Sequence, residues 1–166
     1  MMPPDIHYKR SRFSTRLPWD RLYTASHFWV VEAGPGRWRV GLTKFAARML
    51  GDVVDLEFEV AEGGAIAVGD VVDLEFEVAE GGTVGVGEVI GSLEGFKART
   101  ELYSVLQGTF LGANPALATS LDVLDSDRYG AGWLYAVEGT PDPAALDAAG
   151  YAAVLDATID KMLDRL

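Results

Sequence analysis

The residues able to do chemistry in this chain of 166 residues are its carboxylates, its lysines and two histidines, because cysteine is absent. That absence excludes a thiol nucleophile, a disulfide and a zinc site with cysteine ligands. With His7 and His27 as the only histidines, a metal site built from imidazoles is not expected. Many acidic residues alternate with apolar ones, which is typical of a solvated strand face and not of a converging catalytic pair. We therefore expect neither a catalytic residue nor a bound metal.

One lysine is distinguished by its position in the sequence. Lys97 lies near the end of EVIGSLEGFKA at 88–98, and no other lysine or arginine occurs between Arg48 and Lys97. The surrounding segments predict a strand, a turn and a second strand. Rigid strands would present such a lysine at the tip of a turn, and its flexible four-carbon stem would give the amine reach. A lone surface lysine usually has no such role, so the interpretation of Lys97 depends on its context.

The net charge of −11 is distributed unevenly. Residues 1–26 contain five basic and two acidic side chains, and the remaining residues are strongly acidic. An acidic surface repels a phosphate backbone, so nucleic acid is not an expected partner. No apolar run is long enough to span a membrane, and no apolar block follows the basic residues as in a secretory signal. Asp5 and Asp20 disfavour a mitochondrial transit peptide. We expect a bacterial cytoplasmic protein, with the mitochondrial matrix as the less favoured location.

The first predicted elements are a hairpin and a short helix. In HFWVVEAGPGRWRVGLT, two apolar runs flank the turn residues 33–36. Thr43 can cap the following helix, KFAARML, in which Phe45, Met49 and Leu50 have helical spacing. From Val53 the period becomes two, which predicts a half-buried strand. Its inward residues would be Leu56, Phe58 and Val60.

Further short strands are expected in TVGVGEVIGSLEG, TELYSVLQGTFLG and GWLYAVEG. After Pro141 and Pro143 the pattern becomes helical, and YAAVLDATIDKMLDRL predicts an amphipathic helix with Val154, Ile159 and Leu163 facing inward. Short strands, glycine-rich turns and few helices predict a mainly β fold, a small sandwich or barrel.

The segment GDVVDLEFEVAEGG occurs twice, at 51–64 and at 69–82. The similarity continues beyond the identical residues, so the repeated hairpin units are 51–68 and 69–86. Two units are too few for a solenoid, which needs about three to bury a core. Either copy can pair in the sheet while the other bulges outward, or a strand can be exchanged between two chains. A monomer is expected, with a strand-swapped dimer as the alternative.

Several motifs in order carry a resemblance to a known family: YTASHFWV, GLTKFAARMLGDVV, GEVIGSLEGFKA, ELYS, NPAL and DRYGAGWLYAV. With one repeat removed, the chain from about Tyr23 to Val137 resembles the H protein of the glycine cleavage system. This implies a barrel-sandwich hybrid of the lipoyl- and biotinyl-carrier type. It also implies a division into a basic N-terminal arm (1–22), a carrier β domain (23–140) and a C-terminal helical segment (141–166).

The resemblance implies covalent lipoate on Lys97. The family's attachment lysine lies in a sequence like Glu-Ser-Val-Lys-Ala, and this chain has Glu94-Gly95-Phe96-Lys97-Ala98. Glu94 and Ala98 then correspond to positions by which a lipoate ligase or lipoyl transferase recognises the turn. Phe96 and Ala98 disfavour biotin, whose attachment lysine usually lies between methionines.

The implied function is that of a carrier and not of an enzyme. In the family, the lipoyl arm carries an aminomethyl group from glycine decarboxylase to an aminomethyltransferase, and a dihydrolipoyl dehydrogenase reoxidises the arm. Ser26, Phe28 and Glu101 match residues that line the cleft for the loaded arm. The family's usual His-Glu-Trp is His27-Phe28-Trp29 here, so one acid near the amine is absent. The alternative is an H-like protein of the same fold that is not loaded, or that serves lipoyl relay, and acts as a binding module.

Overall fold

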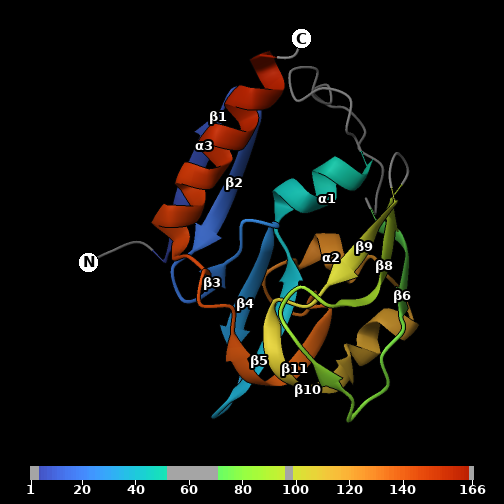
Figure 1. Cartoon of the computed structure of the whole chain (residues 1–166). Helices are drawn as coiled ribbons and strands as arrows, with labels where there is room; N and C mark the ends of the chain where they lie inside the picture. Colours follow the sequence, from blue (N-terminus) through green and yellow to red (C-terminus); the bar gives the residue numbers. More distant parts are fainter. Residues whose placement is uncertain (1–3, 52–70, 96–98, 165–166) are drawn as a thin grey trace.

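The computed structural model of the chain describes residues 4–51, 71–95 and 99–164 (Figure 1). Within these residues, antiparallel pairing builds a two-stranded, a six-stranded and a three-stranded sheet. The strands are β1 (Asp5–Arg10), β2 (Phe13–Pro18), β3 (Leu22–Tyr23), β4 (Phe28–Glu32), β5 (Arg37–Leu42), β6 (Val71–Phe76), β7 (Thr83–Val84), β8 (Val89–Gly95), β9 (Arg99–Tyr103), β10 (Leu106–Ala113) and β11 (Tyr135–Pro141). The helices are α1 (Lys44–Gly51), the 3-10 turn Pro115–Ala118, α2 (Val123–Ser126) and α3 (Ala148–Asp164).

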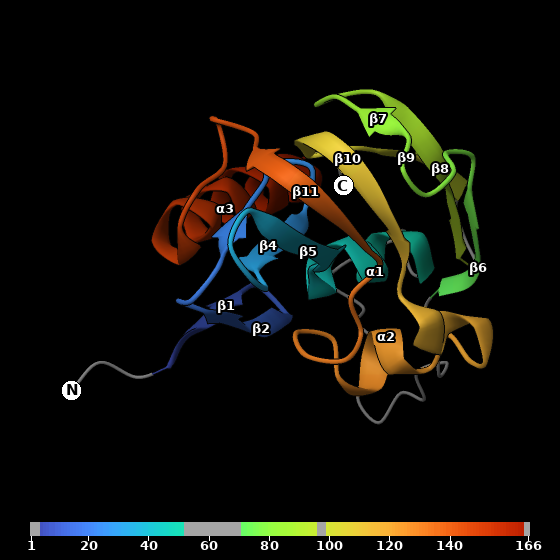
Figure 2. The same ribbon diagram turned by 90° about the horizontal axis from the view of Figure 1, so that it is seen from below.

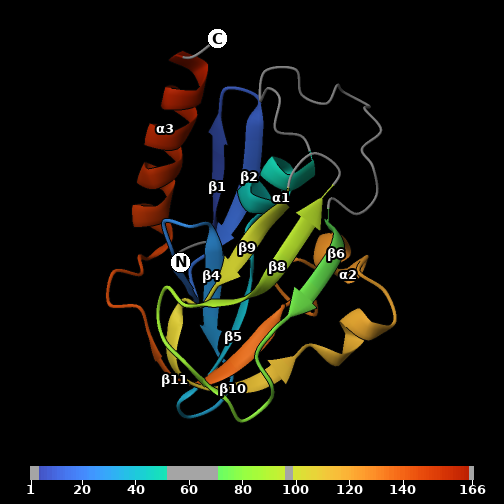
Figure 3. The same ribbon diagram turned by 45° about the vertical axis from the view of Figure 1, so that its right-hand side comes forward.

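Two sheets enclose the main core. The six-stranded sheet has the order β3-β4-β5-β11-β10-β7, and the three-stranded sheet has the order β6-β8-β9. Figure 2 shows the two sheets from below, on either side of the molecule's centre, and Figure 3 shows β6, β8 and β9 side by side. Phe76 of β6 meets Phe110 and Tyr135 of the larger sheet, with ring centroids 5.4 and 5.8 Å apart. The expected mainly β fold is therefore confirmed.

The predicted hairpin and helix are both present. β4 and β5 pair on either side of the turn, where Gly34 and Gly36 have positive φ angles that favour glycine. Thr43 caps α1 as predicted, because its Oγ1 accepts a hydrogen bond from the Ala46 amide at 3.3 Å. Phe45 of this helix is buried as expected.

The second copy of the repeat supplies a core strand. β6 belongs to that copy and pairs with β8, and along 73–78 half-buried apolar residues alternate with exposed acids. This is the period-two pattern that the repeated sequence predicted. The strand predicted from Val53, with Leu56, Phe58 and Val60, lies outside the described residues.

The N-terminal segment contains a hairpin that the sequence analysis did not assign. β1 and β2 pair in register from Asp5 opposite Pro18 to Arg10 opposite Phe13. Figures 1 and 3 show this hairpin beside α3, and together they bury a second apolar cluster that includes Phe13, Leu17 and Phe45. Arg10 also forms ion pairs with α3, to Asp156 at 3.3 Å and to Asp160 at 2.8 Å.

The C-terminal helix is present, but its buried face differs from the predicted one. Ala148, Tyr151, Leu155 and Ile159 are fully buried along α3. Of the predicted inward residues only Ile159 is fully buried, and Val154 and Leu163 are half-buried at the edges of the same cluster. The stripe is shifted because α3 packs between β1 and β3, and the N-terminal hairpin was not foreseen as a partner.

We predict that Phe13→Ala lowers the free energy of unfolding by about 3–5 kcal/mol, because it empties a fully buried site beneath the hairpin. Urea unfolding measures this change. Arg12→Ala, at an exposed position of the same hairpin, is the matched control and should stay within about 0.5 kcal/mol of the wild type. Equal small changes for both variants would mean that the hairpin does not pack on the core in solution.

Candidate functional site

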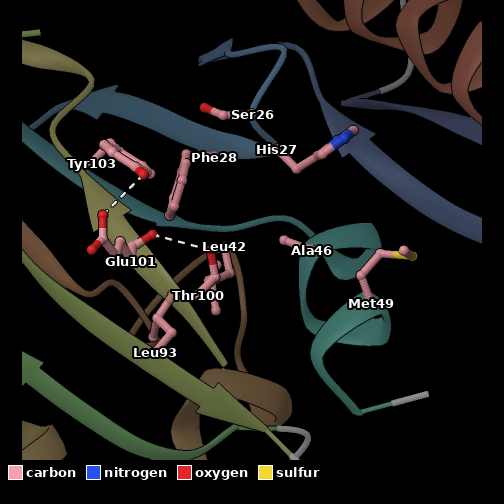
Figure 4. Close-up of a pocket in the computed structure, with 10 residues that line it drawn as sticks. All are labelled: Ser26, His27, Phe28, Leu42, Ala46, Met49, Leu93, Thr100, Glu101 and Tyr103. Carbon is pink, nitrogen blue, oxygen red and sulfur yellow. Dashed lines mark hydrogen bonds between the residues drawn. The ribbon is translucent and has the colours of Figure 1, made fainter. Parts of the chain in front are cut away.

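A cleft with a volume of about 390 Å³ lies beside β9, which is an edge strand of the three-stranded sheet. Its walls come from β9 with Leu93 of β8 on one side, and from β4, α1 and the turn before β4 on the other (Figure 4). Most of the lining is apolar, with polar groups at its edges. The lining residues are Ser26, His27, Phe28, Leu42, Ala46, Met49, Leu93, Thr100, Glu101 and Tyr103.

The structure brings together three residues that the sequence analysis placed in an arm cleft. Phe28 is buried in β4, Ser26 is exposed in the turn before it, and Glu101 is exposed on β9. All three line the same cleft although β9 is more than 70 residues further along the chain than the turn. Their assignment to a lipoyl arm remains a prediction.

The hairpin of β8 and β9 carries the remaining predicted site residues. Glu94 is exposed near the end of β8, and its register partner is Arg99 at the start of β9. Lys97 and Ala98 stand between these strands in the sequence, and both lie outside the described residues, as does Phe96. The last described residues of the hairpin are therefore Gly95 and Arg99.

An acid and a phenol form the polar edge of the cleft. The Tyr103 hydroxyl donates a hydrogen bond to Glu101 Oε2 at 3.0 Å, and this bond raises the pKa of Tyr103 (Figure 4). Tyr103 and Met49 also line the cleft, although neither was predicted there from the sequence. For Tyr103 a signal was present, because it follows Glu101 by two residues on a predicted strand and must share its side.

Behind the cleft, His27 is held by hydrogen bonds. Its Nδ1 is 2.8 Å from the hydroxyl of Tyr151 on α3, and its backbone oxygen accepts from Thr43 Oγ1 at 3.1 Å. Burial lowers the pKa of His27 from 6.5 to about 4, so the imidazole is neutral at neutral pH. These contacts are those of a packed and hydrogen-bonded histidine.

Two further residues that resemble family positions have structural contacts. Ser104 is buried and donates to the Leu106 carbonyl at 2.7 Å. Asn114 caps the 3-10 turn and donates to the carbonyl oxygens of Ala131 and Trp133. Both residues make the contacts of ordinary turn residues.

The described ranges hold neither a cluster of metal ligands nor a membrane-spanning helix. There, histidine and acidic side chains do not gather in threes as a metal ion would require. None of the helices in the same ranges has the length and apolar character needed to cross a membrane.

Comparisons with known proteins agree with the geometry. A family model described as glycine cleavage H-protein matches residues 21–72 and 59–150, and the two stretches overlap within the repeated region. A glycine cleavage system H protein of Mycobacterium avium is 38% identical over 156 residues, covering 94% of this chain and 91% of the relative. One from Beutenbergia cavernae is 36% identical over 143 residues, covering 83% of this chain and 95% of the relative. The crystal structure of a glycine cleavage system H protein from Mycobacterium marinum superposes with a TM-score of 0.65 at 32% identity, covering 82% and 97% of the two chains.

The two facing sheets, the short helix after the first hairpin and the cleft beside an edge strand define a barrel-sandwich hybrid of the carrier type. The chain belongs to the glycine cleavage H-protein family. The expected family and fold are thereby confirmed. Proteins of this family are carriers that generally bear lipoate and work with the enzymes of the glycine cleavage system.

The buried His27 predicts a pH dependence of stability. Its pKa is about 4 in the folded chain and 6.5 when exposed, so between these values the unfolded chain binds a proton that the folded chain does not. Stability therefore falls as the pH falls. Between about pH 7.5 and about pH 5, we expect His27 to account for about 2 kcal/mol of lost unfolding free energy.

Urea unfolding of the wild type and of His27→Asn at both pH values measures this loss. Asparagine removes the titrating ring and tolerates the positive φ of 74° at this position. The wild type should lose about 2 kcal/mol more than the variant between the two pH values. Parallel losses would show that His27 is solvated in the folded chain.

Proposed function

We propose that this chain is a non-catalytic carrier whose lipoyl group, joined by an amide to Lys97, moves an aminomethyl group between the enzymes of glycine cleavage. The observation that supports this most directly is the position of the cleft. It lies along β9, the strand that follows Lys97 in the sequence, and Thr100 and Glu101 at the beginning of β9 line it. Along an extended strand, Glu101 lies about 7 Å beyond Arg99, the first residue of β9.

The residues of the cleft fit a lipoyl arm. Such an arm is a chain of methylenes that ends in two sulfur atoms, and those sulfurs supply the thiol chemistry on which group transfer depends. Phe28, Leu42 and Leu93 offer buried apolar surface, and the Met49 thioether also lines the cleft. Burial of methylenes against such surface contributes about 0.8 kcal/mol for each CH₂.

The polar residues take defined roles in this proposal. The Glu101 carboxylate, held by the Tyr103 hydroxyl, accepts a hydrogen bond from the amine of a loaded arm, and Ser26 offers a hydroxyl on the other wall. Glu94 is exposed near the end of β8, three residues before Lys97, where a lipoate ligase or lipoyl transferase would contact it together with Ala98. Formation of the amide removes the charge of Lys97, which lowers the cost of moving the arm against apolar side chains.

The proposed partners are glycine decarboxylase, an aminomethyltransferase, dihydrolipoyl dehydrogenase and the modifying enzyme. We place the carrier in the bacterial cytoplasm, as a monomer without catalytic residues, divided into the arm (1–22), carrier (23–140) and helical (141–166) segments proposed from the sequence.

One observation favours an alternative. The buried residue at the centre of the cleft is Phe28, so the described lining contains a single carboxylate, Glu101. A cleft of this kind also suits a carrier of the same fold that binds partners or relays lipoyl groups without an aminomethyl load.

We predict that co-expression with a lipoate ligase and lipoate adds one lipoyl increment to the intact mass of the wild type and none to Lys97→Arg. The arginine guanidinium keeps its proton and cannot form the amide. Thermal stability of Lys97→Arg should equal that of the wild type. Lys161→Arg, an exposed lysine on α3, is the matched control and should be modified fully. A lipoyl increment retained in Lys97→Arg would place the attachment elsewhere and contradict the proposal.

The exchange of labelled bicarbonate with glycine, catalysed by purified glycine decarboxylase, measures whether the lipoyl arm accepts an aminomethyl group. It therefore distinguishes the aminomethyl carrier from a carrier of the same fold without an aminomethyl load. The lipoylated wild type should support exchange, and Phe28→Glu should raise it by a factor of about ten, the effect of one added charge-assisted hydrogen bond. Exchange supported by neither lipoylated protein would favour the alternative carrier or binding role.

A further inference from the structure

The C-terminal helix contacts His27, a residue of the cleft wall, through one fully buried side chain, Tyr151. Its ring stacks on Tyr23, with centroids 5.0 Å apart and planes 8° from parallel. Its hydroxyl is 2.8 Å from His27 Nδ1 and 2.8 Å from Thr43 Oγ1. Thr43 Oγ1 in turn donates to the His27 backbone oxygen at 3.1 Å. Three residues from separate parts of the chain therefore form a closed set of contacts.

One assignment of the protons satisfies every contact in this set. Each hydroxyl has a single proton. With the Thr43 proton on the His27 carbonyl, the Tyr151 hydroxyl donates to Thr43 and His27 Nδ1–H donates to Tyr151. Every donor then has an acceptor, and His27 is the neutral tautomer with its proton on Nδ1. We call this set the hydroxyl–imidazole ring.

The hydroxyl–imidazole ring joins the two ends of the wall opposite β9. On one side, His27 has a φ of 74°, and its amide donates to the Thr24 carbonyl at 2.9 Å. The next residue is Phe28, whose amide donates to Thr24 Oγ1 at 3.2 Å. On the other side, Thr43 caps the helix that carries Ala46 and Met49. A shift at Tyr151 is thus transmitted to cleft residues on β4 and on α1 together.

We propose that Tyr151 is a positioning residue, through which α3 holds Phe28 and α1 at the separation that lets the cleft accept the arm. This inference rests on the proposed function. Tyr151 is not among the lining residues, and Figure 4 shows the His27 side chain turned away from Phe28 and Met49, so the effect passes through the wall and not through contact with the arm. Phe28 is on β4 and Met49 is on α1. Loss of the Tyr151 hydroxyl would remove a positional constraint on both elements.

The test compares two variants that each lose one buried hydroxyl from the same stacked pair. Tyr151→Phe breaks the hydroxyl–imidazole ring. Tyr23→Phe is the matched control, since its hydroxyl donates to the Pro18 carbonyl at 2.6 Å and takes no part in that ring. His27→Asn breaks the ring from its other side and serves if Tyr151→Phe does not fold.

The readout is the NMR signal of the Met49 methyl and of the Phe28 amide. In the wild-type background, these signals should differ between the lipoylated chain and unmodified Lys97→Arg, because the arm contacts the wall. We expect that difference to vanish in Tyr151→Phe and to persist in Tyr23→Phe. Hydrogen exchange of the Phe28 and Ala46 amides should accelerate about tenfold in Tyr151→Phe, as expected for loss of one buried hydrogen bond, and less than about twofold in Tyr23→Phe.

Equal behaviour of the two tyrosine variants would overturn the proposal, since the hydroxyl would then be no more than a structural group. A lipoylated wild type whose Met49 and Phe28 signals match those of Lys97→Arg would overturn it as well, while leaving the carrier function standing. Absence of the lipoyl increment from the wild-type mass would instead refute the proposed function on which the inference rests.

Discussion

The burial of Leu102 in the core fixes the register of β9, and the cleft depends on that register. Leu102 is fully buried, and its neighbours Glu101 and Tyr103 are exposed on the strand that borders the cleft. A slip of one residue would exchange these sets and place a carboxylate in the core. β8 ends at Gly95 and its partner β9 begins at Arg99, so Lys97 stands between the two paired strands in the sequence. One leucine thus orients both the polar edge of the cleft and the hairpin.

The second apolar cluster gives the N-terminal hairpin and α3 a joint role. Phe13, Tyr151 and Leu155 share that cluster with Trp29, which belongs to the six-stranded sheet. The hairpin covers α3, α3 supports the turn before β4, and that turn supplies one wall of the cleft. The terminal segments, which are far apart in sequence, therefore support the carrier domain from one side.

The sequence predicted local features well where a single pattern decided them. The turn at 33–36, the Thr43 cap and the period-two strand all follow from short-range chemistry, and the structure has each of them. It could not say which copy of an identical segment forms β6, because identical residues have identical propensities and only tertiary packing separates them. It also failed at 5–18, where polar and apolar residues form strands because α3 is available to pack against them. The same missing partner displaced the predicted face of α3. Ser26, Phe28 and Glu101 came from a resemblance, since nothing in their local sequences indicates that they meet.

Among the described residues, β6 and β9 are the edge strands of the three-stranded sheet, and an edge strand is a site at which a second molecule can add a strand and begin to aggregate. Both edges carry exposed charge: Asp73 and Glu75 on β6, and Arg99 and Glu101 on β9. Two molecules that approached through their β6 edges would bring like charges together. The exposed acidic residues on β6 thus oppose extension of the sheet by a second molecule. Glu101 lies on one of these edges as well as in the cleft, so the same exposed carboxylate opposes strand addition and forms the polar edge of the cleft.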